Sequence, residues 1–450
     1  MKRKEFISKI SKSAILSIGL PSLISCELNQ EKISGLKNWS GNYTYQAKET
    51  KFVNSIEELK NKIVSSKKIK ALGTQHCFND IADTNGTQFS TKNLNSVIEL
   101  NEKEKYVMVL SGIKYGELGQ YLNQRGWALN NLASLPHISV GGACATATHG
   151  SGVFNGNLAS SVLGFELLTS SGEIFWVDPI KNSDLFFGGV VSLGAIGIIT
   201  KIKLRIENTF DVEQYVFENL PMDVLKKNFL DIMKSGYSVS FFTHWLDRNI
   251  NQIWIKSKSG DFLNLKNSFF GASPAKRDLH PIKTNSAINC TPQMGISGPW
   301  HERLPHFKMN FTPSNGDELQ SEYFVPISMA YEAIMSIESL KDKISPILFV
   351  TEIRSIAADN FWMSPTFERD SISIHFTWKP MGKEVLSILP EIELKLKPFM
   401  ARPHWGKIHG FNSTNLKSVY PMYDRFVTLI KEIDPKEALI NSYLNRGFEI

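Results

Sequence analysis

The sequence predicts an α+β protein with two main domains. From residue 39 to about Glu207, short strand-like runs alternate with helical ones, and from about Asn208 longer apolar and aromatic runs replace this alternation. Strict alternation with a period of two, which marks a strand with one buried face, occurs at 201–206 and again at 371–378. A chain of 450 residues is long enough for two or three domains, each with a full core.

The composition is that of an ordinary globular protein, with 42% hydrophobic and 21% charged residues. The formal net charge of +6 is concentrated at the N-terminus, because five basic side chains oppose only Glu5 in the first 25 residues and give +4, leaving +2 for the rest. These basic residues are Lys2, Arg3, Lys4, Lys9 and Lys12. No basic stripe with interleaved aromatic residues follows, so no nucleic-acid partner is expected.

Residues 1–25 have the pattern of a secretory signal, since the basic start precedes an apolar stretch at 14–24 that is too short to span a bilayer. The phrase Leu23-Ile24-Ser25-Cys26 resembles the bacterial lipobox, and Arg3-Lys4-Glu5-Phe6-Ile7 resembles a relaxed twin-arginine signal. We expect an exported bacterial lipoprotein of the periplasm or cell envelope, anchored by a lipid on Cys26 and followed by a tether at 26–37. The alternative is a simple cleaved signal peptide.

Three further cysteines, Cys77, Cys144 and Cys290, form an odd and widely spaced set. Such spacing is neither a disulfide framework nor a cluster of zinc ligands, so we expect small buried residues and no metal site.

Two glycine-rich loops lie in the first domain. The strand-like run Ile69–Leu72 ends at Gly73 and leads into Thr74-Gln75-His76-Cys77-Phe78, and a second glycine-rich stretch covers 139–152. Glycine permits close backbone approach, and successive N–H groups in such turns form an anion-binding nest, so the pair predicts a diphosphate held from both sides. Neither loop has the GxGxxG or GxxxxGK[ST] pattern, which weakens an NAD or P-loop interpretation. For His76, the alternative is a surface loop histidine.

The remaining elements of this domain follow in order. Apolar residues recur at helical spacing over Tyr115–Arg125 and predict an amphipathic helix. The domain closes with Ser192-Leu193-Gly194-Ala195-Ile196-Gly197 and then a strand that alternates apolar and basic residues up to Ile206.

In the second domain, three segments carry polar side chains suited to chemistry. Glu352 and Arg354 are two residues apart, so on a strand they share one face. In 371–378, His375 and other polar residues alternate with apolar ones, and 401–407 places polar side chains beside a tryptophan. These segments predict a pocket for a hydroxyl-rich substrate. The alternatives are a solvated ion pair at Glu352 and Arg354 and the wet face of an edge strand at 371–378.

Taken together, these phrases resemble the FAD-linked oxidases of the vanillyl-alcohol-oxidase superfamily, and within it the alditol oxidases, which include xylitol and sorbitol oxidases. The resemblance runs from about Asn38 to the C-terminus. It rests on phrases in the right order at 38–42, 76–79, 133–139, 298–307, 320–323, 352–354, 375–378 and 402–407.

The resemblance implies a two-subdomain, PCMH-type FAD-binding domain at 38–207 and an α+β substrate (cap) domain at 208–409. The cap domain would resemble aldonolactone oxidases and hold a large antiparallel sheet, and the segment 410–450 would return to the flavin. FAD would be bonded covalently to His76. The implied cofactor-binding residues are Gly73, Thr74, Gln75, His76, Cys77, Phe78, Ser134, Ser139, Gly142, Thr146, Ala147, Thr148, His149, Ile199 and Asn441.

Two departures from the family pattern concern the loops, since Cys77 stands where serine is common and Ala147 replaces a glycine. Both residues are small, so cofactor binding should survive. Some relatives add a cysteinyl link to the flavin from the segment that corresponds to 134–136. This chain has no cysteine there, so a single link is expected.

The resemblance also implies the reaction. A terminal primary hydroxyl of an alditol would be oxidised to the aldose, with a hydride passing to flavin N5 and O2 then yielding H2O2, in a protein expected to be a monomer. The implied catalytic residues are Glu352, Arg354, His375 and Lys407, and the implied substrate-binding residues are Ser134, Glu352, Arg354, Thr377 and Lys407.

Elementary chemistry suits these roles. Arg354 and Lys407 would stabilise the developing alkoxide. His375 would be the base because imidazole titrates near neutrality, provided that Glu352 or another partner orients it. The hydroxyls of Ser134 and Thr377 can both donate and accept hydrogen bonds.

Three alternatives remain open at this point. The chain could be a sugar-1,4-lactone oxidase, a polyol dehydrogenase that passes electrons to a quinone or cytochrome, or a lipid-anchored carbohydrate-binding protein with an inactive flavin fold.

Overall fold

The computed structural model describes residues 35–261, 269–310 and 318–450. The expected signal, Cys26 and most of the expected tether lie outside these residues. Within the described part of the chain, no helix is both long enough and apolar enough to cross a membrane.

The N-terminal half contains two main sheets, as the two-subdomain prediction requires. A parallel sheet has the order β1-β3-β2, with β1 (Glu49–Phe52), β2 (Ile69–Leu72) and β3 (Thr87–Ser90). An antiparallel sheet has the order β4-β5-β9-β7-β8, with β4 (Val97–Asn101), β5 (Tyr106–Leu110), β7 (Val162–Leu168), β8 (Ile174–Val177) and β9 (Ile198–Arg205). The short strands β6 (Trp127–Ala128) and β10 (Glu207–Asn208) pair with each other.

The helices of this half are α1 (Ile56–Ile63), α2 (Tyr115–Asn123), α3 (Val140–Ala145) and α4 (Ser183–Gly189). The predicted helix at 115–125 is therefore confirmed as α2, and its apolar residues Tyr115, Leu118 and Leu122 are buried. The strand predicted at 69–72 is β2. In β9, Ile202 and Leu204 are buried while Lys201 and Lys203 are half-exposed, as the alternation predicts.

A nine-stranded sheet dominates the second half, with every pairing antiparallel. Its main path is β14-β11-β13-β12-β17-β18-β16-β19, with β15 also on β11. The strands are β11 (Asp211–Pro221), β12 (Ser238–Thr243), β13 (Asn249–Lys258), β14 (Ser273–Pro274), β15 (Gly298–Pro299), β16 (Leu319–Pro326), β17 (Leu348–Ile356), β18 (Ser371–Trp378) and β19 (Arg402–Pro403). The prediction of an α+β chain with a large antiparallel sheet is confirmed.

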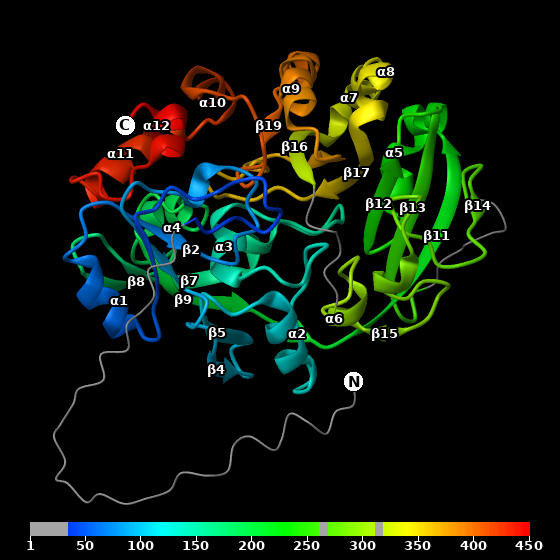
Figure 1. Cartoon of the computed structure of the whole chain (residues 1–450). Coiled ribbons are helices and arrows are strands. Elements are labelled where there is room, and N and C mark those ends of the chain that lie inside the picture. The colour runs from blue at the N-terminus through cyan, green and yellow to red at the C-terminus, as the bar shows by residue number, and fades with distance from the viewer. Residues whose placement is uncertain (1–34, 262–268, 311–317) are drawn as a thin grey trace, which may run out of the picture. The chain divides into compact units, whose positions relative to one another are not determined.

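Helices α5 (Leu225–Met233), α7 (Ala330–Glu338) and α9 (Gly382–Leu396) cover one face of this sheet (Figure 1). Their apolar residues pack in one cluster with inward-facing strand residues such as Ile353 and Ile374. The opposite face carries the polar side chains and contacts the first half, since Arg354 donates to Ser134 Oγ and to the His149 carbonyl. The short helices α6 (Trp300–Arg303) and α8 (Lys341–Ile344) complete this half.

Strand β18 lies inside the sheet, between β16 and β17, and all its residues are buried. The alternative of an edge strand with a wet face is therefore wrong. Alternation arises here because one face meets a hydrophobic core and the other a buried polar site.

The C-terminal segment forms α10 (Ser413–Val419), α11 (Tyr423–Ile433) and α12 (Ser442–Phe448), which lie beside the N-terminal half in Figure 1. Asn441 caps α12, and its amide donates to the carbonyls of Asp80, Ile81 and Asp83. These hydrogen bonds attach the C-terminal segment to residues 80–83, which follow the His76 loop.

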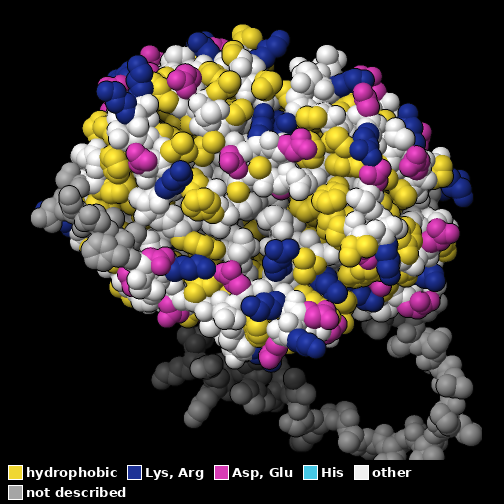
Figure 2. Space-filling model, turned by 180° about the vertical axis from the view of Figure 1, so that it is seen from behind, with side chains coloured by type: hydrophobic (Ala, Val, Ile, Leu, Met, Phe, Trp, Pro, Cys, Tyr) yellow, Lys and Arg dark blue, Asp and Glu magenta, His cyan; other side chains and the backbone are white. Residues whose placement is uncertain are grey.

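The described surface is mixed in charge. On the face seen in Figure 2, basic and acidic side chains are interspersed among apolar ones.

Candidate active site

One continuous cavity is lined by both halves of the chain. It brings together nearly all the site residues that the sequence singled out. Those lining it are Gly73, Thr74, Gln75, His76, Cys77, Phe78, Ser134, Ser139, Gly142, Thr146, Thr148, His149, Ile199, Glu352, Arg354, His375, Thr377 and Lys407.

The two glycine-rich loops meet at one end of this cavity. A Cβ added at Gly73 would lie 2.7 Å from Ser139 Oγ, so the two loops approach closely here and a side chain would displace the serine hydroxyl. Gln75 adopts a left-handed conformation with φ 65°, which turns the chain into His76. Trp39 stacks on the His76 ring, with the centroids 5.4 Å apart and the planes at 20°. Trp39 thus contacts one part of the His76 loop, and the second glycine-rich loop approaches it at Gly73.

Four buried polar atoms of residues lining this end have no hydrogen-bond partner among the described residues: the Tyr45 hydroxyl oxygen, His76 Nε2, Ser111 Oγ and Ser139 Oγ. Buried polar atoms are nearly always bonded, so these atoms fit a polar ligand that runs between the two loops. His76 Nδ1 lies 3.0 Å from Thr74 Oγ1, and burial lowers the pKa of His76 to about 4. Its uncharged ring leaves Nε2 for that ligand. The residues present therefore fit a dinucleotide such as FAD.

Two residues implied as cofactor contacts do not line the cavity. Ala147 is buried with φ 53°, so it shapes the backbone of the second loop and does not face the cavity. Asn441 has its amide fully used by three backbone carbonyls, as described above, and acts on the 80–83 segment. Lys70 and Gly194, which lie in the phrases at 69–72 and 192–197 but were not among the implied cofactor contacts, also line the cavity.

At the other end, three neighbouring strands present a row of ionisable side chains. His375 on β18 is directly opposite Glu322 on β16 and Glu352 on β17. Directly opposed residues of an antiparallel pair share a face, so all three point into the cavity. The side chains of Glu322 and Glu352 are 0% and 7% exposed, which excludes a solvated ion pair at Glu352 and Arg354.

Arg354 lies between the two carboxylates. One terminal nitrogen donates to Glu322 Oε1 at 3.0 Å, and the other donates to Ser134 Oγ at 3.3 Å. Its Nε lies 3.5 Å from Glu352 Oε1 and makes no hydrogen bond among the described residues. A fixed cation with a spare donor therefore faces the cavity.

Glu322 is the main site residue that the sequence did not predict, although it lies in the matching phrase 320–323. Lys407 Nζ donates to its Oε2 at 2.6 Å, and His149 Nε2 lies 3.1 Å from its Oε1. Burial alone would raise the pKa of Glu322, but Lys407, His149 and Arg354 hold it well below its usual range. Glu322 is thus an ionised anchor for both cationic donors of the site. The phrase 320–323 was the signal that could have placed it, because Leu319–Pro326 does not alternate between apolar and polar residues.

Glu352 is also ionised, because Arg354 and His306 outweigh the effect of burial and hold its pKa far below the usual range. Burial lowers the pKa of Lys407, and the negative charge of Glu322 opposes this decrease. The site therefore combines two ionised carboxylates with two cationic donors in a desolvated space.

His375 differs from the prediction in one respect. Burial, with Lys407 nearby, lowers its pKa to about 3, so the ring does not titrate near neutrality. Neither ring nitrogen has a hydrogen-bond partner within the described chain, and Nδ1 is 3.9 Å from Glu352 Oε2. His375 is thus a neutral ring in the cavity that Glu352 approaches without a hydrogen bond.

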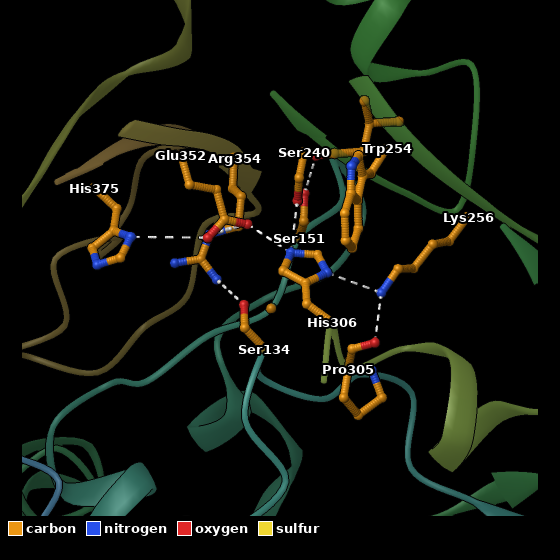
Figure 3. A network of polar contacts seen from close by, with 12 residues as sticks. Ser134, Ser151, Ser240, Trp254, Lys256, Pro305, His306, Glu352, Arg354 and His375 are labelled. Carbon is orange, nitrogen blue, oxygen red and sulfur yellow. Dashed lines mark hydrogen bonds and ion pairs between the residues drawn. The ribbon is translucent and has the colours of Figure 1, made fainter. Parts of the chain in front are cut away.

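Behind Glu352 lies a second buried network, which Figure 3 shows from close by. His306 Nε2 is 2.7 Å from Glu352 Oε1, and Lys256 Nζ is 3.1 Å from His306 Nδ1. Neither residue was predicted as a site residue, although His306 lies in the matching phrase 298–307.

Comparison with known proteins agrees with this arrangement. A family model described as FAD binding domain matches residues 52–178, and one described as D-arabinono-1,4-lactone oxidase matches 311–447. The chain is 39% identical to the alditol oxidase of a Streptomyces species over 91% of this chain and 98% of that protein. It is 25% identical to the L-gulonolactone oxidase of Mus musculus over 85% of this chain and 90% of that protein.

Among solved structures, cholesterol oxidase from B. sterolicum superposes with a TM-score of 0.76 at 12% identity, covering 96% of this chain and all of that chain. At that identity the likeness shows the fold alone. The 39% identity to the alditol oxidase covers almost the whole of both proteins. The chain therefore belongs to the alditol oxidase family, within the vanillyl-alcohol-oxidase superfamily of FAD-linked oxidases.

Proposed function

We propose that the protein oxidises the terminal primary hydroxyl of alditols such as xylitol and sorbitol to the aldose, with O2 as the acceptor and H2O2 as the second product. One observation carries this proposal. Arg354 and Lys407 converge with Glu322 and Glu352 in the cavity that the two cofactor loops also line. A hydroxyl-rich substrate matches such a set of charged donors and acceptors.

Each group in the cavity has a separate role in this reaction. FAD, held by the two loops that contain residues 73–78 and 139–149, would supply the oxidant that accepts a hydride from the alcohol carbon and returns the electron pair to O2. Arg354 and Lys407 stabilise the negative charge that develops on the hydroxyl oxygen. His375 can accept the hydroxyl proton because neither ring nitrogen has a partner among the described residues, and the ionised Glu352, 3.9 Å from Nδ1, would stabilise the imidazolium against its lowered pKa of about 3. Glu352, Ser134 and Thr377 bind further hydroxyls and orient the chain of the substrate.

An oxygen-uptake screen with purified protein tests the proposal. We expect xylitol, sorbitol or mannitol to drive oxygen consumption and peroxide formation without an added acceptor. Uptake with aldonolactones alone would instead assign a lactone oxidase, in line with the family match at 311–447. Activity that needs an added quinone or cytochrome would assign a dehydrogenase.

We also propose that His76 carries FAD covalently. Its ring lines the cavity between the loops, with Nε2 buried and unpaired among the described residues. The flavin should stay with the chain after acid denaturation of the wild type. A His76→Ala variant should release its flavin on denaturation or lose it during purification. Free flavin above the precipitated wild-type protein would contradict the covalent link.

For the N-terminus we propose a lipid anchor on Cys26, on the strength of the Leu23-Ile24-Ser25-Cys26 phrase. The mature wild type should begin at Cys26 and partition with membranes, whereas Cys26→Ser should accumulate as the unprocessed precursor. Intact-mass analysis checks this. A mature chain that starts elsewhere and carries no lipid would exclude the anchor and leave the simple cleaved signal peptide.

A further inference from the structure

Lys256 is a buried cation behind the active site. Its side chain comes from β13 and is 1% exposed, and it does not line the cavity. Nζ donates to the carbonyl oxygens of Leu304 and Pro305 and lies 3.1 Å from His306 Nδ1. Figure 3 shows the ammonium on the far side of His306 from Glu352.

The chemistry of an ammonium fixes the state of His306. A protonated lysine has three hydrogens and no lone pair, so it can only donate. His306 Nδ1 must therefore accept, which leaves the proton of the neutral ring on Nε2. The ring is neutral because burial and the charge of Lys256 lower the pKa of His306 to about 4. Nε2–H then donates to Glu352 Oε1 at 2.7 Å.

The orientation of the ring is also fixed by packing. Trp254 and Phe242 meet His306 edge-on, with centroids 5.1 and 5.6 Å away. Ser240 Oγ lies 3.4 Å from Nε2 and adds a second polar neighbour on that side. Because the ring is held and does not rotate, Nδ1 stays directed at Lys256 and Nε2–H stays directed at Glu352.

The consequence appears at Glu352. Its Oε1 is occupied by His306 and approached by Arg354 Nε, whereas its Oε2 accepts no hydrogen bond among the described residues. This second oxygen lies on the side of His375, at 3.9 Å from Nδ1, where the cavity opens. One oxygen is thus anchored, and the other is left for a substrate hydroxyl.

We propose that Lys256 is a positioning residue which acts through His306. It enforces the Nε2–H tautomer of His306 and thereby holds Glu352 ionised, with one oxygen directed at a hydroxyl of the polyol. This inference deepens the proposed function and rests on it, since it assigns to Glu352 the binding of the substrate.

The charges around Lys256 suit this role. Burial lowers the pKa of Lys256 to about 7. Glu352 and Cys290 oppose this decrease, and the positive charge of Arg354 adds to it. Glu352, the carboxylate that Lys256 helps to position, thus favours the ammonium, which is lost as the pH rises through about 7. A neutral amine would carry a lone pair and would no longer dictate the tautomer of His306.

The test uses the flavin-loaded protein and a Lys256→Met variant, which keeps most of the volume and removes the donor. The matched control is Lys258→Met, two residues along the same strand, whose ammonium pairs with Glu207 at 3.2 Å. Nitrogen-15 NMR of labelled histidine reports the His306 tautomer directly. Stopped-flow reduction with xylitol gives the Kd of the polyol and the limiting rate separately.

We expect the wild type and Lys258→Met to show the Nε2–H tautomer of His306, and Lys256→Met to show a mixture of tautomers. In Lys256→Met, the Kd for xylitol should rise about tenfold, equivalent to about 1.4 kcal/mol. The limiting rate should change by less than about threefold, because the group lost orients substrate and does not touch the reacting atoms.

Two substitutions of His306 keep the proposal testable if Lys256→Met does not fold. His306→Gln places an amide N–H near the position of Nε2, so it should keep the donor to Glu352 and a Kd near that of the wild type. His306→Asn places its amide near Nδ1, so it should keep the contact with Lys256 and bind xylitol about tenfold more weakly.

An unchanged tautomer, or an unchanged Kd in both Lys256→Met and His306→Asn, would overturn the proposal. Failure of the wild type to be reduced by any polyol would be a different result, because it would refute the proposed function. The NMR measurement would still decide whether Lys256 sets the tautomer of His306.

Discussion

Replacement of Arg354 by methionine is expected to slow reduction of the flavin by polyol roughly a hundredfold or more, the usual result of removing one preorganised donor worth ~3 kcal/mol. The same change should lower the free energy of unfolding by about 3–5 kcal/mol, because it leaves two buried carboxylates without the cation between them. Those carboxylates are Glu322, bonded to Arg354 at 3.0 Å, and Glu352, at 3.5 Å.

Arg354→Lys separates the two effects. It keeps a positive charge between the carboxylates but loses the planar fork that also reaches Ser134 and the His149 carbonyl. We expect most of the stability to return in urea unfolding and only part of the rate to return in stopped-flow reduction. Wild-type reduction by Arg354→Met would show that the guanidinium does not face the reacting hydroxyl.

The second large effect is expected for Lys407→Met. Lys407 donates to Glu322 at 2.6 Å and lines the cavity, so its loss should also slow flavin reduction roughly a hundredfold. Stability should suffer less than in Arg354→Met, because Glu322 keeps its contacts with Arg354 and His149. Flavin content should be unchanged, because the 405–407 segment contacts the His76 loop through backbone carbonyls, which the substitution keeps.

Lys417→Met is the matched control, because that lysine is exposed on α10 and pairs only with Asp424 on the surface. Single-turnover reduction with saturating xylitol measures both variants. If Lys407→Met reduced its flavin as fast as the control, the alkoxide would have to be stabilised by other groups.

Local pattern predicted most of the fold. The run at 69–72 and the glycine that ends it specify a strand and a tight loop, and the spacing of Tyr115, Leu118 and Leu122 specifies a helix with one buried face. The alternation of 371–378 predicted a strand, but not its central place. Alternation reports two different faces and does not say whether the polar face meets water or a buried site.

The candidate site could be predicted only in part, because its charge balance depends on contacts across strands. Glu322 neutralises Arg354 and Lys407, and that becomes visible only from the pairing of β16 with β18. His306 contacts Glu352 from a loop, and Lys256 on β13 contacts His306. The pKa of His375 also escaped prediction, since desolvation is a property of the packed molecule.

We propose above that the buried charges of Glu322, Glu352, Arg354 and Lys407 serve the oxidation of a polyol. Anaerobic mixing of the flavin-loaded protein with xylitol or sorbitol tests this proposal most directly. We expect saturable bleaching of the flavin, formation of the corresponding aldose, and return of the yellow colour with release of H2O2 when air is admitted. A flavin that stays oxidised with every alditol would contradict it.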